Sequence, residues 1–439
     1  MEQITYTKSI ETRITTDVLV VGGGAAGVTA AVAAARAGRQ VLLVETNGAF
    51  GGVGTTGLVP AFAPFTDGER QLCAGIGGEI RAQVSRHKPI GTYWTPIDAE
   101  ELKRAYDRVV IGAGVQVLFF TSVVDAVATD GHIDYVLLSS RRGMYAVRAK
   151  VYIDCTGDGT LTALAGGEFA LGDENGDVMP PTLCSLWGGL DMEAYRADKG
   201  NVTAKLYQAI DDGVFTFADR HLPGFFLKTD GYTGGNLGHI FDTDCLDEAS
   251  MTHAMIWGRQ SMEEYARFYR EYVDGCANLR LLGTGEMLGV RESRRICCDY
   301  TLGVDDFLAR ADFNDEIGRY CYPVDIHIMS TDEAELKRFE EEYRIKLRYK
   351  KGESYGIPYR SLVPVSFDNV LTAGRCMGTD RQMEASIRVM PGCFITGQAA
   401  GAAAALAVDA GGEVRRVDVA TLQRMLRESG AYLRDEIFA

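Results

Sequence analysis

The sequence DVLVVGGGAAGVTAAVAAARAGRQVLLVE, residues 17–45, constrains the fold more than any other part of the chain. Its apolar run VLVV predicts a buried parallel strand, and the alanine-rich stretch that follows predicts a helix. Gly22, Gly24 and Gly27 form a G-x-G-x-x-G pattern between the two. The first glycine permits a tight turn, the second lets the backbone approach a pyrophosphate, and the third lets helix and strand pack closely. The segment therefore predicts a nucleotide-binding strand, turn and helix.

The residues after the turn complete this pattern. The free amides at the start of the helix, at Ala25 and Ala26, favour a pyrophosphate anion. Arg36 lies in the last turn of the helix, and Gly38 can adopt the left-handed conformation just beyond it. VLLVE predicts the next strand, and its last residue, Glu45, is placed to accept hydrogen bonds from an adenosine ribose. The pattern predicts a dinucleotide cofactor without separating NAD from FAD.

Three later segments favour FAD. The glycine-rich loop FGGVGTTG, residues 50–57, resembles the loop beside the pyrophosphate and flavin in flavoproteins of the glutathione-reductase type. Residues 115–138 alternate apolar side chains around a turn, which predicts a small antiparallel layer. A strand over residues 151–154 then returns to the first sheet and ends at TGDG. The third segment predicts a strand over residues 370–373 that ends in Gly374 and Arg375.

Residues 389–408, VMPGCFITGQAAGAAAALAV, carry no formal charge and are long enough to span a membrane. Their seven alanines, together with Gly397 and Gly401, instead favour a buried helix that packs tightly on its neighbours. We expect Pro391 and Gly392 to break the first half of this helix. No membrane span is therefore predicted, and the positive end of the helix is expected to face the flavin pyrimidine ring.

These segments, with the phrases GVRESRRI (289–296), YPVDIH (322–327), IPYRSLVP and NVLTAGRC, resemble the FAD-dependent oxidoreductase family, some of whose members carry a xanthan-lyase label. The resemblance covers nearly the whole chain. It implies an α/β fold in which a Rossmann-like FAD-binding domain of glutathione-reductase type, residues 1–172 and 356–439, carries an inserted α+β substrate or cap domain, residues 173–355. It also implies non-covalent FAD in an extended pose, because GGVGTTG offers no His or Cys for a covalent link.

The motifs and the resemblance together give a set of expected cofactor-binding residues. They are Gly22, Gly24, Ala25, Ala26, Gly27, Glu45, Gly51, Gly52, Val124, Thr156, Gly157, Asp158, Gly374, Arg375, Gly397 and Ala400. One of these residues departs from the pattern of many flavoproteins, in which the late strand ends in Gly-Asp and the aspartate binds the ribitol chain of the flavin. Arg375 stands there in this chain, so we expect it to face phosphate or an anionic substrate. Asp158 is a ribitol ligand by resemblance alone.

The catalytic candidates lie in the middle of the chain and at its return to the FAD domain. They are His239, Arg291, Arg295, His327 and Arg360. On a helix, Arg291 and Arg295 would share a face and clamp a carboxylate or phosphate, although an ion-paired surface explains them equally well. The two histidines are candidate proton carriers, with an ordinary structural role as the alternative. Cys393, near a helix N-terminus, is either redox-active or simply packed.

Several classes of function are disfavoured. A net charge of -15 without a basic run argues against nucleic acid, and the N-terminus lacks a secretory core, so a cytoplasmic protein is expected. None of the ten cysteines forms a CxxC pair, and GDENGDV lacks the ligand order of a calcium loop, so no metal is predicted. GTGEMLG, residues 283–289, is a weak match to a second nucleotide loop.

The predicted function is hydride transfer between a small polar organic substrate, either anionic or a sugar, and the N5 atom of FAD. The alternatives are a flavin monooxygenase, an electron-transfer subunit that works with a protein partner, and a non-catalytic FAD-binding module. The sequence leaves open the substrate, the direction of the reaction and whether the chain forms a homo-oligomer.

Overall fold

The computed structural model describes residues 4–5, 7–84, 90–228, 231–328, 330–332, 337, 341 and 347–438. Its first elements confirm the predicted strand, turn, helix and strand: β1 (Thr12–Val21), α1 (Ala25–Arg36) and β2 (Val41–Val44). Gly22 and Gly38 have φ angles of 93° and 83°, a region that favours glycine, so both turns depend on their lack of a side chain.

The main sheet has the strand order β5-β2-β1-β8-β7-β6, with β17 also paired to β8. The remaining strands of this sheet are β5 (Gln116–Leu118), β6 (Ser122–Thr129), β7 (His132–Ser140), β8 (Gly143–Asp154) and β17 (Val370–Thr372). β5, β2, β1, β8 and β17 are parallel, whereas β6, β7 and β8 form an antiparallel meander. The long strand β8 joins the two parts, because its first half pairs with β7 and its end with β17.

The expected antiparallel layer is therefore present, with one difference. Residues 116–118 pair in parallel with β2 and form an edge strand of the main sheet. The side chains of β1 point alternately to the two faces of the main sheet, and both faces are covered. Val18 and Val20 pack in the core with α1, while Leu19 and Val21 pack against the meander. The sheet is thus buried on both faces, as its continuous apolar strands require.

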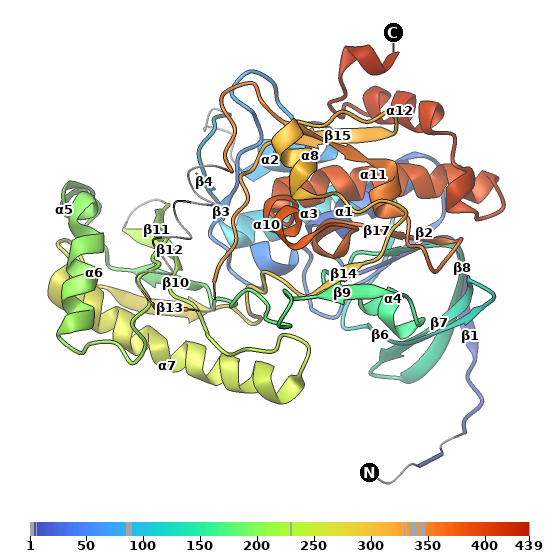
Figure 1. The fold of residues 1–439 in the computed structure, drawn as a ribbon. Helices are drawn as coiled ribbons and strands as arrows, with labels where there is room; N and C mark the ends of the chain where they lie inside the picture. Colours follow the sequence, from blue (N-terminus) through green and yellow to red (C-terminus); the bar gives the residue numbers. More distant parts are fainter. Residues whose placement is uncertain are drawn as a thin grey trace.

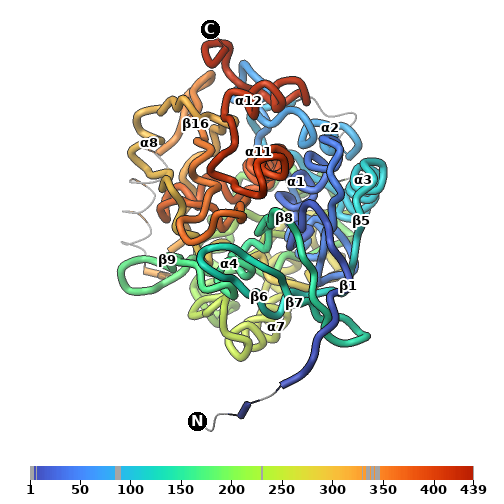
Figure 2. The backbone as a smooth tube through the Cα atoms, turned by 90° about the vertical axis from the view of Figure 1, so that its right-hand side faces the viewer, coloured from blue at the N-terminus to red at the C-terminus, as the bar shows by residue number. Residues whose placement is uncertain are grey.

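α11 (Met390–Asp409) lies along α1, and Figure 2 shows the two helices side by side. A Cβ at Gly397 would lie 2.1 Å from the carbonyl oxygen of Ala26, and one at Gly401 would lie 2.0 Å from that of Ala30. The expected break at Pro391 is wrong, because this proline sits in the first turn, where a missing N–H costs no helical hydrogen bond. By length and composition α11 alone among the described helices could cross a membrane, yet most of it is buried inside the protein.

A second sheet stands beside the first. Its order is β11-β12-β10-β13. Its strands are β10 (Ser185–Gly188), β11 (Gly224–Leu227), β12 (Tyr232–Asn236) and β13 (Arg280–Thr284), accompanied by α5 (Met192–Asp198), α6 (Val202–Asp211) and α7 (Glu248–Tyr272). These elements have their own apolar core around Trp187, Phe225 and Tyr269, and they form the left side of Figure 1. We call this part of the chain, residues 183–290, the cap.

The expected domain boundaries at 173 and 356 stay a prediction. The second half of the expected insertion contributes to the core around α11 rather than to the core of the cap: β15 (Glu316–Tyr320) pairs with β16 (Tyr355–Pro358), and Ile317 and Tyr355 are buried there.

Short elements complete the fold. They are α2 (Gly75–Val84), α3 (Ala99–Gly112), α4 (Thr160–Leu164), α8 (Val304–Ala309), α10 (Arg381–Ile387) and α12 (Val419–Glu428), with the strand pairs β3 (Ala61–Phe62) and β4 (Thr95–Pro96), and β9 (Phe169–Leu171) and β14 (Arg294–Ile296). GVRESRRI does not form the helix on which Arg291 and Arg295 would share a face. Its last residues form β14, where strand pairing with β9 replaces helical hydrogen bonding.

Candidate functional site

A cavity of about 1300 Å³ lies between the carboxyl edge of the parallel strands and the cap. Four strands each contribute the residue that directly follows the strand: Gly22 after β1, Glu45 after β2, Cys155 after β8 and Ala373 after β17. Ligands of open α/β sheets bind at this edge, because loops diverge there and helix N-termini point toward it. The volume exceeds that of an ordinary ligand pocket, so it has room for a dinucleotide and a second molecule.

The glycine turn has the shape that a bound pyrophosphate requires. A Cβ at Gly24 would meet no atom within 4 Å, so the backbone there is open to the cavity. No side chain in the described part of the protein caps α1, and Ala25 and Ala26 line the cavity at its start. A Cβ at Gly27 would lie 1.8 Å from the carbonyl oxygen of Gly22. The backbone N–H groups of the turn are therefore able to bind an anion. The third glycine, Gly27, allows the helix to pack closely against the turn.

Glu45 is fixed at the end of β2. Its Oε2 accepts a hydrogen bond of 2.7 Å from the amide of Gly23, and its Oε1 accepts bonds of 2.8 Å from the amide and side chain of Asn47. A carboxylate has about four acceptor sites, so this one retains capacity for further donors. Because Glu45 lines the cavity, that capacity suits the hydroxyls of a ribose.

The other expected cofactor residues fall into three groups. Gly51, Gly52, Thr156, Gly157, Asp158, Gly374 and Arg375 line the cavity. Gly397 and Ala400 lie in α11 and pack behind it, where their small size lets α11 approach α1. Val124 lies outside the cavity with 39% of its surface exposed. Its neighbour Val123 lines the cavity instead, because successive side chains of a strand point to opposite faces.

Arg375 and Asp158 form an ion pair, with Nη2 of the guanidinium 2.7 Å from Oδ1 of the carboxylate. The hydroxyl of Ser293 donates to the same carboxylate oxygen at 2.7 Å. Both charged residues line the cavity. The arginine that replaces the expected acid is therefore compensated by a carboxylate in the turn that follows the neighbouring strand β8.

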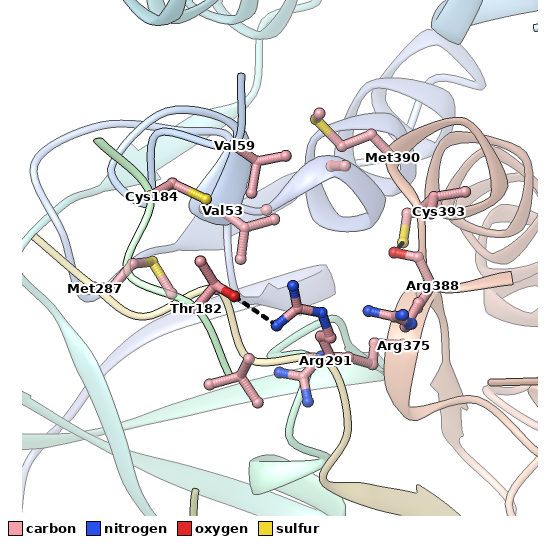
Figure 3. Close-up of a pocket in the computed structure, with 18 of the residues that line it drawn as sticks. Val53, Val59, Thr182, Cys184, Met287, Arg291, Arg375, Arg388, Met390 and Cys393 are labelled. Carbon is pink, nitrogen blue, oxygen red and sulfur yellow. Dashed lines mark hydrogen bonds between the residues drawn. The ribbon is translucent and has the colours of Figure 1, made fainter. Parts of the chain in front are cut away.

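Two further arginines meet at the cavity from different elements, as Figure 3 shows. Nη1 of Arg291 donates to the carbonyl of Pro180 at 2.7 Å and to the hydroxyl of Thr182 at 2.8 Å. Arg388 donates to the carbonyl of Asp325 at 2.8 Å. Burial, and then the charge of Arg388, lower the pKa of Arg291 to about 10. Two close and partly desolvated cations favour an anionic ligand.

Three histidines line the same end of the cavity: His221, His239 and His327. Nε2 of His239 lies 2.7 Å from Nδ1 of His327. The outer nitrogens face carboxylates, with Nδ1 of His239 at 3.2 Å from Asp219 and Nε2 of His327 at 3.5 Å from Asp325. Burial, opposed by the carboxylates and aided by Arg291, lowers the pKa of both His239 and His327, so both rings are neutral at pH 7.

The two carboxylates of this cluster remain ionised. Burial raises the pKa of Asp219 and of Asp325, but the neighbouring imidazoles outweigh it and hold both below the usual range. Asp325 also accepts a hydrogen bond of 3.0 Å from the hydroxyl of Tyr322. Sequence reasoning selected His239 and His327 but missed His221 and Asp219, which no spacing pattern marks.

Two expected catalytic residues are not in the cavity. Arg295 points into the protein, where Nη1 lies 2.6 Å from Glu292 and 3.5 Å from Glu384. Arg360 pairs with Asp315 at 2.9 Å and lies over the ring of Tyr300. Their expected pairing with substrate rested on a helix for GVRESRRI and on proximity to the cleft, and strand β14 turns the first of them away.

Two weaker sequence signals are also resolved. GTGEMLG begins in β13, the edge strand of the antiparallel cap sheet, and no helix follows it in residues 285–293. It therefore lacks the strand, turn and helix of a nucleotide loop. Cys393 lines the cavity, but burial raises the pKa of its thiol to about 12, which outweighs the effects of Arg375 and Arg388.

Residues 17–426 match the FAD dependent oxidoreductase family. The chain belongs to this family, so it is a flavoprotein oxidoreductase whose cofactor is non-covalent FAD. The open glycine turn, the fixed Glu45 and the ring of strand ends fit this cofactor.

Solved structures of flavoproteins are similar to this chain at low identity. A geranylgeranyl bacteriochlorophyll reductase-like protein from Thermoplasma acidophilum is 12% identical, with 95% of this chain and 84% of that chain covered and a TM-score of 0.49. The flavin-dependent brominase Bmp2 is 12% identical, with 94% and 83% covered and a TM-score of 0.46. The p-nitrophenol 4-monooxygenase PnpA from Pseudomonas putida DLL-E4 is 12% identical, with 95% and 84% covered and a TM-score of 0.43. No curated protein matches the chain.

Proposed function

We propose that the protein is a dehydrogenase or reductase that exchanges a hydride between FAD and a small polar organic molecule, with an anionic group on that molecule. One observation carries the proposal. The cavity that is lined by the glycine turn and Glu45 is also lined by Arg291, Arg388 and the three histidines. Cofactor and substrate would thus share one enclosed space. When bound, FAD supplies the hydride acceptor or donor at its N5 atom.

The arginines are the part of the chain suited to bind and orient the substrate. Arg291 is only 7% exposed and is held in place by Pro180 and Thr182, so little conformational freedom is lost when it binds an anion. Arg388, directly after α10, adds a second cation close to Arg291, as seen in Figure 3. A substrate carboxylate between the two would add to the compensation that Asp325 gives Arg388 at 3.8 Å.

Apolar side chains close the space around this polar end. Val53, Val59, Met287 and Met390 line the cavity beside the arginines. Water excluded by these side chains cannot compete for the substrate or screen its charge. Oxidation of an alcohol removes a hydride from carbon and a proton from oxygen. The polar end, with its histidines and carboxylates, is where that proton would leave the substrate.

The test is an anaerobic titration of the FAD-bound protein with hydroxy acids, amino acids, sugars, amines and NAD(P)H, followed at the flavin absorption band. Bleaching by a carboxylate-bearing donor is expected. Arg291→Met is expected to abolish this bleaching at low donor concentration, while dithionite still reduces the flavin. Arg360→Gln is the matched control, because Arg360 lies outside the cavity and pairs with Asp315.

Other outcomes would replace the proposal. Bleaching by NAD(P)H alone, followed by an oxygen-dependent hydroperoxide spectrum, would indicate a monooxygenase. Co-purification with an iron-sulfur protein would indicate an electron-transfer subunit. A flavin that no donor in the panel reduces would contradict catalysis on small molecules.

A further inference from the structure

The three histidines of the cavity form a nearly equilateral triangle. Their ring centroids are 4.9 Å apart for His221 and His239, 4.9 Å for His221 and His327, and 5.0 Å for His239 and His327. One nitrogen from each ring lies within 4.8 Å of the other two. Imidazoles that share one tetrahedral ion are also about 5 Å apart, because each nitrogen lies about 2 Å from the ion and the rings diverge from it.

The outer nitrogens of two rings are held by carboxylates. Asp219 faces Nδ1 of His239 and Asp325 faces Nε2 of His327, which leaves Nε2 of His239 and Nδ1 of His327 directed toward each other. Asp219 also accepts a bond of 2.9 Å from the amide of His221, so one carboxylate positions two of the three residues. Histidines that bind a metal are oriented in this way, with the second nitrogen donating to a carboxylate.

We propose that His221, His239 and His327 bind one divalent first-row transition ion, Zn²⁺ in the first instance, with its remaining coordination position open to the cavity. Three neutral imidazoles with one open position are a donor set suited to zinc, and imidazole also suits iron, copper and nickel. In the structure the facing nitrogens of His239 and His327 are 2.7 Å apart. Binding would separate them to about 3.3 Å through a small rotation of the rings.

The charges around the triangle define what would bind there with the ion. Asp219 and Asp325 balance Arg291 and Arg388, which line the same end of the cavity. A divalent ion would leave this end positive, so an anionic oxygen ligand is favoured at the open position. This role rests on the proposed function: the ion would hold a hydroxyl or carbonyl oxygen of the substrate while Arg291 holds its carboxylate.

The test of the site does not depend on catalysis. Untagged, FAD-bound protein is stripped of metal, titrated with ZnCl₂ by calorimetry, and analysed for bound zinc by mass spectrometry after dialysis. One zinc per chain is expected. His221→Ala is expected to weaken binding at least about a hundredfold, because it removes one of three ligands. Asp219→Asn is expected to weaken it about tenfold to a hundredfold, because it releases His239 and His221.

His253→Ala is the matched control, since His253 is exposed on α7 and belongs to no group of metal-ligand side chains among the described residues. Retained FAD and unchanged circular dichroism show that each variant is folded. Zinc bound equally by all four proteins, or by none, would overturn the metal site. Flavin reduction by a protein that binds no zinc would overturn the metal site, assign the histidines to a hydrogen-bonded proton relay and leave the proposed function standing. Stoichiometric zinc without reduction by any donor would leave the site standing and overturn that function.

Discussion

The guanidinium of Arg375 lies 2.7 Å from the carboxylate of Asp158, and this pair joins the turn after β8 to the segment after β17 at the edge of the cavity. The two residues are 217 positions apart in the chain. Each was expected to contact the cofactor separately. Because the two charges neutralise each other, a single substitution leaves one unpaired charge in the cavity, whereas a double substitution leaves none. The two kinds of variant should therefore differ in their affinity for FAD.

Arg375→Met is expected to weaken FAD binding about tenfold to a hundredfold, because it leaves the charge of Asp158 unpaired beside an anionic cofactor. Asp158→Asn combined with Arg375→Met removes both charges and is expected to recover at least half of the lost binding free energy. Quenching of flavin fluorescence in equilibrium titrations measures both values. A double variant no better than the single one would mean that Arg375 acts on the cofactor directly.

The close contact of α1 with α11 leads to a prediction about stability. A methyl group at position 401 would lie 2.0 Å from the carbonyl oxygen of Ala30, in the core. Gly401→Ala is therefore expected to lower the free energy of unfolding by about 2–3 kcal/mol, despite the higher helix propensity of alanine. Gly112→Ala is the control, because Gly112 also lies in a helix but a Cβ there meets no atom within 4 Å. It is expected to leave stability unchanged or to raise it by up to about 1 kcal/mol.

Urea unfolding of the two FAD-saturated variants beside the parent protein measures this difference. Equal stability of Gly401→Ala and the parent would show that α11 can shift away from α1 without cost. In that case close packing against α1 would not explain the small side chains of α11.

The cofactor side of the cavity could be predicted from the sequence. The turn at Gly22, the acid Glu45 and the helix around Gly401 were recognised because each depends on neighbours in the chain: glycine spacing, strand and helix period, and composition. The FAD side of the cavity is built from such local motifs. Gly27, Gly397 and Ala400 serve the packing behind the cavity, and Val124 lies outside it while its neighbour Val123 lines it.

The substrate side could not be predicted in this way. His221, His239 and His327 come from three separate segments, two in the cap and one after β15, and only the folded chain brings them together. GVRESRRI left two readings open, an anion clamp and an ion-paired surface. Arg295 is ion-paired with Glu292 and Glu384, but it is buried rather than at the surface. Whether an arginine faces a substrate or a buried carboxylate is decided by tertiary contacts, which charge spacing does not encode.

Glu384, on α10, gives a pH-dependent prediction. It is fully buried, and its Oε1 has no hydrogen-bond partner among the described residues. Burial, and then the charge of Glu292, raise its pKa to about 8. An unfolded chain releases this proton near pH 4.5, so the favourable contribution of Glu384 is complete below that pH and is lost as the pH rises toward 8.

Glu384→Gln removes this titration, so its stability relative to the parent is expected to rise between pH 5 and pH 8. Urea unfolding at several pH values measures the difference. Glu353→Gln is the control: the amide of Lys350 and then Arg310 lower the pKa of Glu353, so it is ionised in both states over this range and its difference stays constant. A constant difference for Glu384→Gln as well would show that Glu384 is ionised in the folded protein.

Cys393 lies at the start of α11 and lines the cavity, a position that suggests a reactive thiol. Its Sγ donates to the carbonyl of Arg388 at 3.2 Å, and burial raises its pKa to about 12. Iodoacetamide at pH 8 is therefore expected to modify it at least about a hundredfold more slowly than an unfolded cysteine, because so little thiolate is present. Peptide mass spectrometry after timed labelling measures the rate, with urea-unfolded protein as the reference.

Slow labelling is expected with FAD bound and after its removal, since burial among protein side chains is the cause. Fast labelling of the FAD-free protein would show instead that the cofactor alone protects a reactive thiol.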